Sequence, residues 1–138
     1  MHQRRVVITG LGVLAPNGCG KETFWQACIQ GRSGIRPIAR FAENDFPTRI
    51  AGNVPDFAPE RFGLTPDECM HLGRTGQFAV AAANLALEDA GFSSVHLRDS
   101  ERERMGVYIG SAMASIEEAE EAWSQFNGKE TYSSQNRS

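Results

Sequence analysis

Hydrophobic and polar positions follow one another along the chain in blocks that predict strands and helices in turn. A short apolar, β-branched run over residues 5–13, closed by glycines, predicts a buried strand. The block over residues 21–30 places its apolar side chains on or near one helical face, and Gly31 suits the end of that helix. A second apolar run over residues 105–111 predicts a second buried strand. This alternation favours an α/β fold.

Further helical patterns lie between and after these strands. Thr65 has the side chain of an N-cap residue and is followed by a proline and two acids, which predicts a helix start. Residues 75–90 carry apolar side chains at three- and four-residue steps, with small side chains on all faces over 79–83. We therefore expect a long helix that is buried, closely packed and ended by Gly91. Residues 115–118 have capping-box spacing, and the apolar positions that follow share one helical face.

Other stretches predict irregular structure. Residues 34–57 contain three prolines and two strand-like pieces, at 36–41 and 49–54, which we expect to form short edge strands. Residues 96–104 are dense in charge and are expected to form a solvated connection. The last twelve residues contain one hydrophobic side chain, Tyr132, and two strands are too few for a finished sheet. We therefore expect the fold to be incomplete in this chain.

Composition and charge narrow the class of protein. At 138 residues, with 41% hydrophobic and 22% charged residues, the chain is one domain's worth of an ordinary soluble protein. A net charge of −3 argues against a nucleic-acid partner, which would need a basic surface. The sequence has no apolar run approaching the roughly 20 residues that cross a bilayer, and its start lacks the features of a signal peptide. We therefore expect a cytoplasmic protein without membrane contact.

The residues that most often bind metals or form disulfides are scattered. The three cysteines, Cys19, Cys28 and Cys69, lack zinc spacing and are odd in number, so we expect free, buried thiols. The histidines at positions 2, 71 and 96 are expected at the surface or at helix ends. Four glutamates between positions 117 and 121 surround an apolar helical stripe and are interpreted as a solvated face. We therefore expect no metal site.

The stretch VITGLGVLAPNGCGKET, residues 7–23, resembles a nucleotide-binding turn but fails two tests. A P-loop requires Ser or Thr after Gly-Lys, and Glu22 stands there. A dinucleotide site requires a helix directly after the glycines and an acid about 20 positions further on. Turn-forming residues intervene instead, and residues 30–33 contain no acid. We interpret the glycines as serving a tight strand exit and expect no cofactor, so a nucleotide-binding module is the least favoured of three hypotheses.

Six motifs stand in a characteristic order over nearly the whole chain. They are RRVVITGLG at 4–12, FW at 24–25, GRSGI at 31–35, Phe41 with DFP at 45–47 and IAG at 50–52, AAANLALEDAG at 81–91, and GVYIGS at 106–111. In this order and spacing they resemble the N-terminal part of the β-ketoacyl-acyl carrier protein synthases. These are the elongating condensing enzymes of type II fatty acid and polyketide synthesis.

The resemblance implies a thiolase-like fold, layered α/β/α/β/α, with residues 1–138 as the N-terminal segment of a ketosynthase N-terminal domain. The family catalyses decarboxylative Claisen condensation with two histidines and a cysteine nucleophile, whose thiolate is both a strong nucleophile and a good leaving group. In the family these three residues follow the part that this chain matches, so we assign no catalytic residue here. The implied partners are an acyl carrier protein, the remainder of the ketosynthase in the same or a separate polypeptide, and a second ketosynthase in a homodimer or heterodimer.

The chain departs from the family pattern at two places, at Ala112 and Ala114 beside Met113 and at Gly73. Met113 aligns with the apolar gate over the acyl tunnel, and the resemblance implies a substrate-binding role for it. Ala112 and Ala114 stand where the family usually has glycine, which reduces backbone freedom beside the gate. A flexible core filler is the alternative interpretation of Met113. Gly73 stands where many relatives have an acid before the arginine, so a local ion pair is expected to be missing.

The resemblance leaves two functional hypotheses open beside the nucleotide-binding module. The first is a catalytic condensing enzyme of which this chain is the opening third, inactive alone. The second is a non-catalytic homologue, such as a chain-length-determining or remnant subunit, that acts as a binding partner. We favour the first, and we expect the chain alone to be aggregation-prone or partly molten, because it would expose surfaces that the rest of the fold covers.

Overall fold

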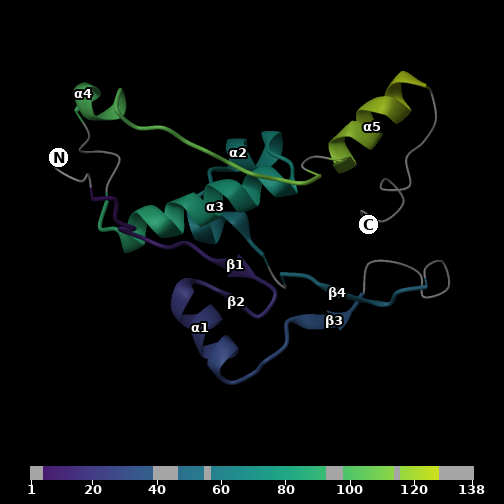
Figure 1. The fold of residues 1–138 in the computed structure, drawn as a ribbon. Helices are drawn as coiled ribbons and strands as arrows, with labels where there is room; N and C mark the ends of the chain where they lie inside the picture. The colour runs from purple at the N-terminus through teal and green to yellow at the C-terminus, as the bar shows by residue number, and fades with distance from the viewer. Residues whose placement is uncertain (1–4, 39–46, 55–56, 93–97, 114–115, 128–138) are drawn as a thin grey trace.

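A long helix runs through the middle of the molecule, and the other elements are arranged around it (Figure 1). The computed structural model describes residues 5–38, 47–54, 57–92, 98–113 and 116–127. Helix α3 (Arg74–Asp89) is the central element, and two small antiparallel sheets and helix α1 (Lys21–Ile29) lie along one side of it. The described residues thus form a mixed α/β arrangement, as the sequence pattern predicts.

The first sheet and α1 form a compact turn unit. Strand β1 (Leu14–Ala15) pairs antiparallel with strand β2 (Gly18–Cys19). Helix α1 begins after Gly20, whose φ of 85° lies in the left-handed region that glycine adopts without strain. The helix ends where the Arg32 amide donates to the Ala27 carbonyl at 2.8 Å. The predicted helix over 21–30 is confirmed.

The second sheet lies within the proline-containing excursion. Strand β3 (Ile35–Pro37) pairs antiparallel with strand β4 (Ile50–Gly52), with Ile35 opposite Gly52. The predicted short strands are therefore confirmed, although they are shorter than the pieces expected at 36–41 and 49–54, and residues 39–46 lie outside the described residues. Ile35 and Ile50 are exposed, as expected for an edge ribbon with one uncovered face.

A short connection brings the chain back to α3. The 3₁₀ helix η1 (Pro59–Phe62) and helix α2 (Pro66–His71) precede α3. The Asn84 side chain donates to the Phe62 carbonyl at 2.8 Å and so attaches η1 to the middle of α3. The Phe57 ring packs between Phe62 and Phe78, with ring centroids 5.5 and 4.4 Å apart. The predicted helix start at Thr65 and the predicted end at Gly91, whose φ is 66°, are both confirmed.

The covering of α3 is less complete than the sequence predicts. Within the described part of the chain the buried hydrophobic side chains are Ala27, Leu64 and Ala81. Ala83, on another face of α3, is exposed, and most other side chains of the helix are half-buried. The expectation of a helix buried on all sides is therefore wrong for this chain, because small side chains permit close packing but do not supply the neighbour.

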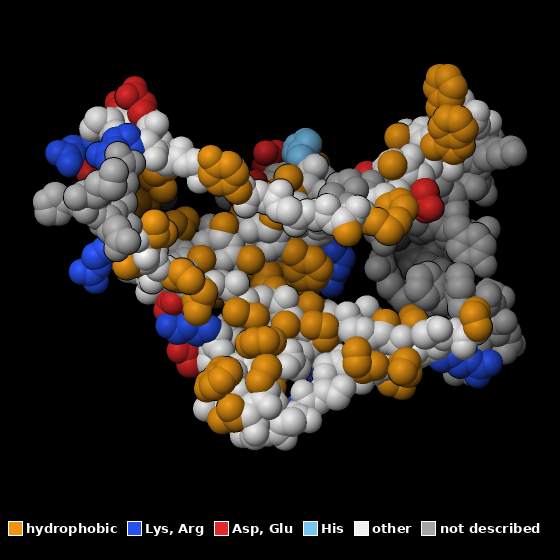
Figure 2. Space-filling view, viewed as in Figure 1, with side chains coloured by type: hydrophobic (Ala, Val, Ile, Leu, Met, Phe, Trp, Pro, Cys, Tyr) orange, Lys and Arg blue, Asp and Glu red, His pale blue; other side chains and the backbone are white. Residues whose placement is uncertain are grey.

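Both predicted core strands are wrong as strands. Residues 5–13 and 105–111 are extended but pair with no strand among the described residues. Their apolar side chains are largely exposed: Val6 is 94% exposed and Tyr108 97%. Hydrophobic side chains accordingly spread over the visible face of the molecule in Figure 2. The physical reason is that β-branched residues make a segment fit for a sheet, whereas a strand also needs a hydrogen-bonding neighbour.

The C-terminal elements are two helices. The described part of the predicted solvated connection, residues 98–104, is exposed apart from the half-buried Glu101. It contains a short helix, α4 (Asp99–Arg102), stabilised by an Arg98–Glu101 ion pair at 2.8 Å. Helix α5 (Ile116–Phe126) confirms the predicted amphipathic helix. Its apolar side chains remain largely exposed, at 69% for Trp123 and 84% for Phe126. The predicted capping residue Ser115 lies outside the described residues.

Candidate functional site

The glycines of the 7–23 stretch pack against α3. A Cβ added at Gly12 would collide with the Ala82 carbonyl oxygen and would lie 2.8 Å from the Ala86 nitrogen. A Cβ at Gly10 would collide with the Ala86 carbonyl and would lie 2.7 Å from the Ala90 nitrogen. Glycine at these two positions therefore lets the extended backbone lie directly on the helix. This close approach explains the glycines more fully than the predicted strand exit does.

Asp89 joins three elements next to these glycines. Its carboxylate accepts a hydrogen bond from the Leu11 amide at 2.9 Å and forms an ion pair with the Lys21 ammonium. The hydrogen bond from Lys21, helped by the one from Leu11, holds the pKa of Asp89 below its ordinary value. The same bond raises the pKa of Lys21. Asp89 therefore fastens the first extended segment and the start of α1 to the end of α3.

The hollow beside this ion pair does not suit a phosphate. It has a volume of about 430 Å³ and is lined by Leu11, Gly20, Lys21, Glu22, Leu85, Glu88 and Asp89. Three of these residues are acids, and the one ammonium is already paired with Asp89. Phosphate-binding turns instead present backbone amides and an uncommitted cation to the anion. The electrostatics thus disfavour the nucleotide-binding hypothesis at the place where the sequence suggested it.

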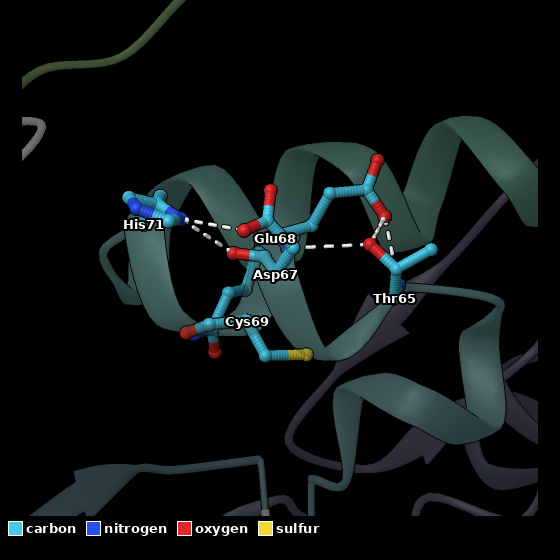
Figure 3. Close-up of polar contacts among 6 residues, drawn as sticks. Thr65, Asp67, Glu68, Cys69 and His71 are labelled. Atoms are coloured by element: carbon cyan, nitrogen blue, oxygen red, sulfur yellow. Dashed lines mark hydrogen bonds and ion pairs between the residues drawn. The ribbon is translucent and has the colours of Figure 1, made fainter.

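Helix α2 brings together a histidine, two acids and a cysteine (Figure 3). The Glu68 amide donates to the Thr65 hydroxyl at 3.2 Å, and the Thr65 amide donates to the Glu68 carboxylate at 2.7 Å. The two bonds form the capping box that starts the helix. The Thr65 amide and the Thr65 hydroxyl both donate to the Glu68 carboxylate, and these bonds lower the pKa of Glu68. His71 lies at the other end, with Nδ1 2.9 Å from the Asp67 carbonyl oxygen. The predicted helix-end location of His71 is confirmed.

The environment of the cysteines does not activate a nucleophile. Burial raises the pKa of Cys19, and burial followed by the charges of Glu60 and Glu68 raises that of Cys69. The Cys69 thiol points away from His71 in Figure 3. All three cysteines are free, as predicted, but the expectation that they are buried is wrong: Cys28 is exposed and the other two are intermediate. A thiolate nucleophile needs a lowered pKa or an adjacent base, whereas the pKa values of Cys19 and Cys69 are raised.

Arg74 lies over an aromatic pair. Its guanidinium carbon is 5.1 Å from the Phe57 ring centroid and 4.9 Å from that of Phe78. A neighbouring hollow of about 490 Å³ is lined by Gly52, Asn53, Val54, Arg74 and Phe78. Cation–π contacts of this kind stabilise packing. Arg74 therefore connects the start of α3 to the aromatic cluster.

Met113 lies between the second extended segment and α5. It is 69% exposed, and its neighbours 114–115 lie outside the described residues. A Cβ at Gly110, three positions earlier, would meet no atom within 4 Å. The structure therefore places the Met113 side chain on an exposed surface of the described chain.

Among the described residues, no helix is both long and apolar enough to span a membrane. In the same part of the chain, no group of three or more His, Cys, Asp and Glu side chains is placed to bind a metal ion.

Two contacts between distant parts of the chain were not predicted from the sequence. Asp89 was visible as part of LEDAG, but its partners Leu11 and Lys21 lie 78 and 68 positions away. Glu118 was assigned to a solvated face, yet it is half-buried against Gly73. The replacement of an acid by Gly73 at the start of a long helix was the available signal for this second contact.

The described residues combine a mixed α/β arrangement, a glycine segment that lies on a long helix, and the carboxylate of the LEDAG motif. Comparison with known proteins identifies the class of protein to which these features belong. Residues 3–137 match the family model for the β-ketoacyl synthase N-terminal domain. The chain therefore belongs to the β-ketoacyl synthase family, and the resemblance seen in its motifs is confirmed.

Individual relatives come from polyketide and fatty acid synthesis. Over 112 residues the chain is 46% identical to the granaticin polyketide putative β-ketoacyl synthase 1 of Streptomyces violaceoruber, covering 81% of this chain and 26% of that protein. Over 119 residues it is 41% identical to 3-oxoacyl-[acyl-carrier-protein] synthase 2 of Coxiella burnetii, covering 84% of this chain and 27% of that protein. The chain thus spans about a quarter of the length of the curated relatives it matches.

A solved structure supports the same relationship. The ishigamide ketosynthase/chain length factor matches with a TM-score of 0.59 and 45% sequence identity, over 68% of this chain and 23% of that one. Homology to β-ketoacyl synthases therefore rests on the sequence and on the fold of the described residues.

Proposed function

We propose that this chain is the N-terminal segment, residues 1–138, of a β-ketoacyl-acyl carrier protein synthase. The complete enzyme would catalyse decarboxylative Claisen condensation of an acyl thioester with malonyl-acyl carrier protein. The observation that carries the proposal is the family match over residues 3–137, in a chain that spans about a quarter of the length of the relatives it matches. The nucleophilic cysteine and two histidines would lie outside this chain.

The exposed apolar segments support this assignment. Residues 5–13 and 105–111 have strand-like sequences but lack paired neighbours among the described residues. In the layered α/β/α/β/α fold implied by the family, such segments would pair with strands from the rest of the enzyme.

The proposed partners follow from the relatives. The ishigamide structure is a ketosynthase/chain length factor, and relatives are named as acyl carrier protein synthases. We therefore propose association with an acyl carrier protein and with the remainder of a ketosynthase. A ketosynthase homodimer or heterodimer would be the assembled form.

The test is reconstitution in trans. The chain is co-expressed with the part of the granaticin synthase that follows the matched region, and that synthase's own N-terminal segment serves as the matched control. Native mass spectrometry measures complex formation, and mass spectrometry of the carrier protein measures the β-ketoacyl product. The proposal predicts a complex and product with both segments. If the control segment forms the complex and this chain does not, the proposal is contradicted.

The catalytic function and the alternative from the sequence analysis are distinguished with the remainder of the ketosynthase from this protein's own source, because in the test above the granaticin part supplies the cysteine and the histidines. For a catalytic enzyme, that remainder should carry the nucleophilic cysteine and two histidines and should yield product with this chain. The remainder of a non-catalytic homologue, such as a chain-length-determining or remnant subunit, would form the complex but yield no product. The ishigamide match supports keeping this alternative, because its name gives a chain length factor beside the ketosynthase.

We also propose that Met113 contributes to the acyl tunnel gate. Its support is its alignment with the family's gate position and its location between an extended segment and α5. In the reconstituted enzyme, Met113→Ala should shift the distribution of acyl chain lengths, because a smaller side chain widens the tunnel. Met105→Ala is the control, since Met105 is also exposed. An unchanged distribution with normal turnover would contradict the gate role.

A further inference from the structure

The start of α3 lacks the local features that normally stabilise a helix N-terminus. Its N-cap residue is Gly73, which has no side chain to accept a hydrogen bond, and its first turn contains no acid. Arg74 instead places a positive charge at the positive end of the helix dipole. The Gln77 amide group donates to the Cys69 and Leu72 carbonyls at 3.0 and 2.9 Å, so it does not supply a negative charge either.

A carboxylate from another helix occupies this position. A Cβ added at Gly73 would collide with the Glu118 carboxylate and would lie 3.2 Å from Glu118 Cγ. Glu118 belongs to the first turn of α5 and is half-buried. In Figure 1 the first turn of α5 lies next to the first turn of α3. The space that a side chain at position 73 would fill is thus filled by a residue 45 positions further along the chain.

The backbone of Gly73 does not itself require glycine. Its φ of −62° and ψ of 166° are open to any residue. The effect of a side chain at this position would be steric, because it would displace the Glu118 carboxylate, which is the far end of a flexible side chain. This contrasts with Gly20 and Gly91, where a positive φ favours glycine and a Cβ would meet nothing within 4 Å.

We propose that Glu118 is a positioning residue that supplies the missing negative charge to the start of α3. Gly73, which has no side chain, leaves the space that the Glu118 carboxylate occupies. The carboxylate would complement the positive end of the α3 dipole across the tertiary structure. The contact also fixes the first turn of α5, and with it the segment that contains Met113, five positions earlier.

The exposure of α5 explains why such an anchor matters. Helix α5 has 11 residues, and isolated helices of this length are marginal in water. Its apolar residues Ile116, Trp123 and Phe126 are 45%, 69% and 84% exposed, so packing of this face on the described chain contributes little. The Glu118–Gly73 contact is therefore well placed to control whether α5 stays docked.

The test measures amide hydrogen exchange of α5 by mass spectrometry on the full chain, with α1 as internal reference. Gly73→Ala and Glu118→Gln should each raise the exchange rate of α5 about threefold to tenfold. Gly76→Ala and Glu120→Gln are the matched controls. Gly76 is on α3, where the nearest atoms to an added Cβ belong to the Leu72 side chain, and Glu120 is exposed on α5. The controls should change α5 exchange less than twofold.

A double variant separates this contact from general damage. In the variant that combines Gly73→Ala with Glu118→Ala, α5 amides should exchange no faster than in Glu118→Ala alone, because the space beside position 73 is then empty. Additive effects, or single variants that behave like the controls, would overturn the proposal. If α1 exchange also rises in Gly73→Ala, that substitution has disturbed more than the contact. The Glu118→Gln result then tests the proposal by itself, since this substitution leaves the steric fit unchanged.

Discussion

The two extended apolar segments, residues 5–13 and 105–111, have similar sequences but different attachments. The first reaches α3 through Gly10 and Gly12, and its Leu11 amide is bound by Asp89. The second has open space around Gly110 and exposed side chains at Val107, Tyr108 and Ile109. The comparison teaches that strand propensity is shared by both segments, whereas docking depends on a neighbour that approaches the backbone.

The largest expected effect breaks the docking of the first segment. Gly12→Val would drive a side chain into the Ala82 carbonyl, and overpacking of this kind costs about 3 kcal/mol. Amide exchange in α3 should therefore accelerate about a hundredfold. Gly110→Val is the matched control, because a Cβ there meets no atom within 4 Å, and it should leave α3 exchange within twofold. Equal effects of the two variants would erase the proposed difference between the segments.

A smaller effect comes from the carboxylate that binds the first segment. Asp89→Asn removes the ion pair with Lys21, so α3 exchange should rise at neutral pH, but less than in Gly12→Val. The pKa of Asp89 is lowered in the folded chain, so its contribution is present above its ordinary pKa of 3.8 and is lost as the pH falls through the folded value. The wild type should consequently lose this protection on acidification, and the variant should show a flatter profile.

Glu88→Gln is the control for that prediction. Glu88 is an exposed neighbour on α3 that lines the same hollow. It should keep the acid dependence of the wild type. If Asp89→Asn retained the full acid dependence as well, another carboxylate would have to hold the first segment.

The capping box of α2 provides a third and more local test. Thr65→Ala removes the hydroxyl that accepts from the Glu68 amide, and loss of such a cap costs about 1 kcal/mol. Exchange should rise about fivefold in α2 and little in α1. Thr75→Ala, at an exposed position in the first turn of α3, should have little effect. Comparable changes in α1 would show that the cap stabilises more than its own helix.

The smallest effect is expected in the second segment. Tyr108→Ser changes a side chain that is 97% exposed, so the stability of the chain alone should change by less than about 0.5 kcal/mol. Exchange in α3 measures this. In the complex proposed above, the same substitution should weaken association, because Tyr108 would lie in a completed sheet. A strong effect on the chain alone would show that the second segment is already packed.

The sequence alone determined the local elements and the family. Helices α1 and α3 begin and end near the predicted residues, and α2 begins at the predicted Thr65 cap, because caps, turn glycines and apolar periodicity act within a few positions. The paired edge strands β3 and β4 followed from short β-branched pieces between prolines. The six motifs identified the β-ketoacyl synthase family without the structure, and the family match confirmed it.

Tertiary structure alone decided which predicted surfaces are covered and which side chains meet. Pairing at residues 5–13 and 105–111 could not follow from their own sequences, because a ladder needs a second strand at the correct spacing. The contacts of Asp89 with Leu11 and of Glu118 with Gly73 join residues 78 and 45 positions apart. No local pattern encodes such distances, because they arise only when the chain brings both ends of α3 against segments far away in the sequence.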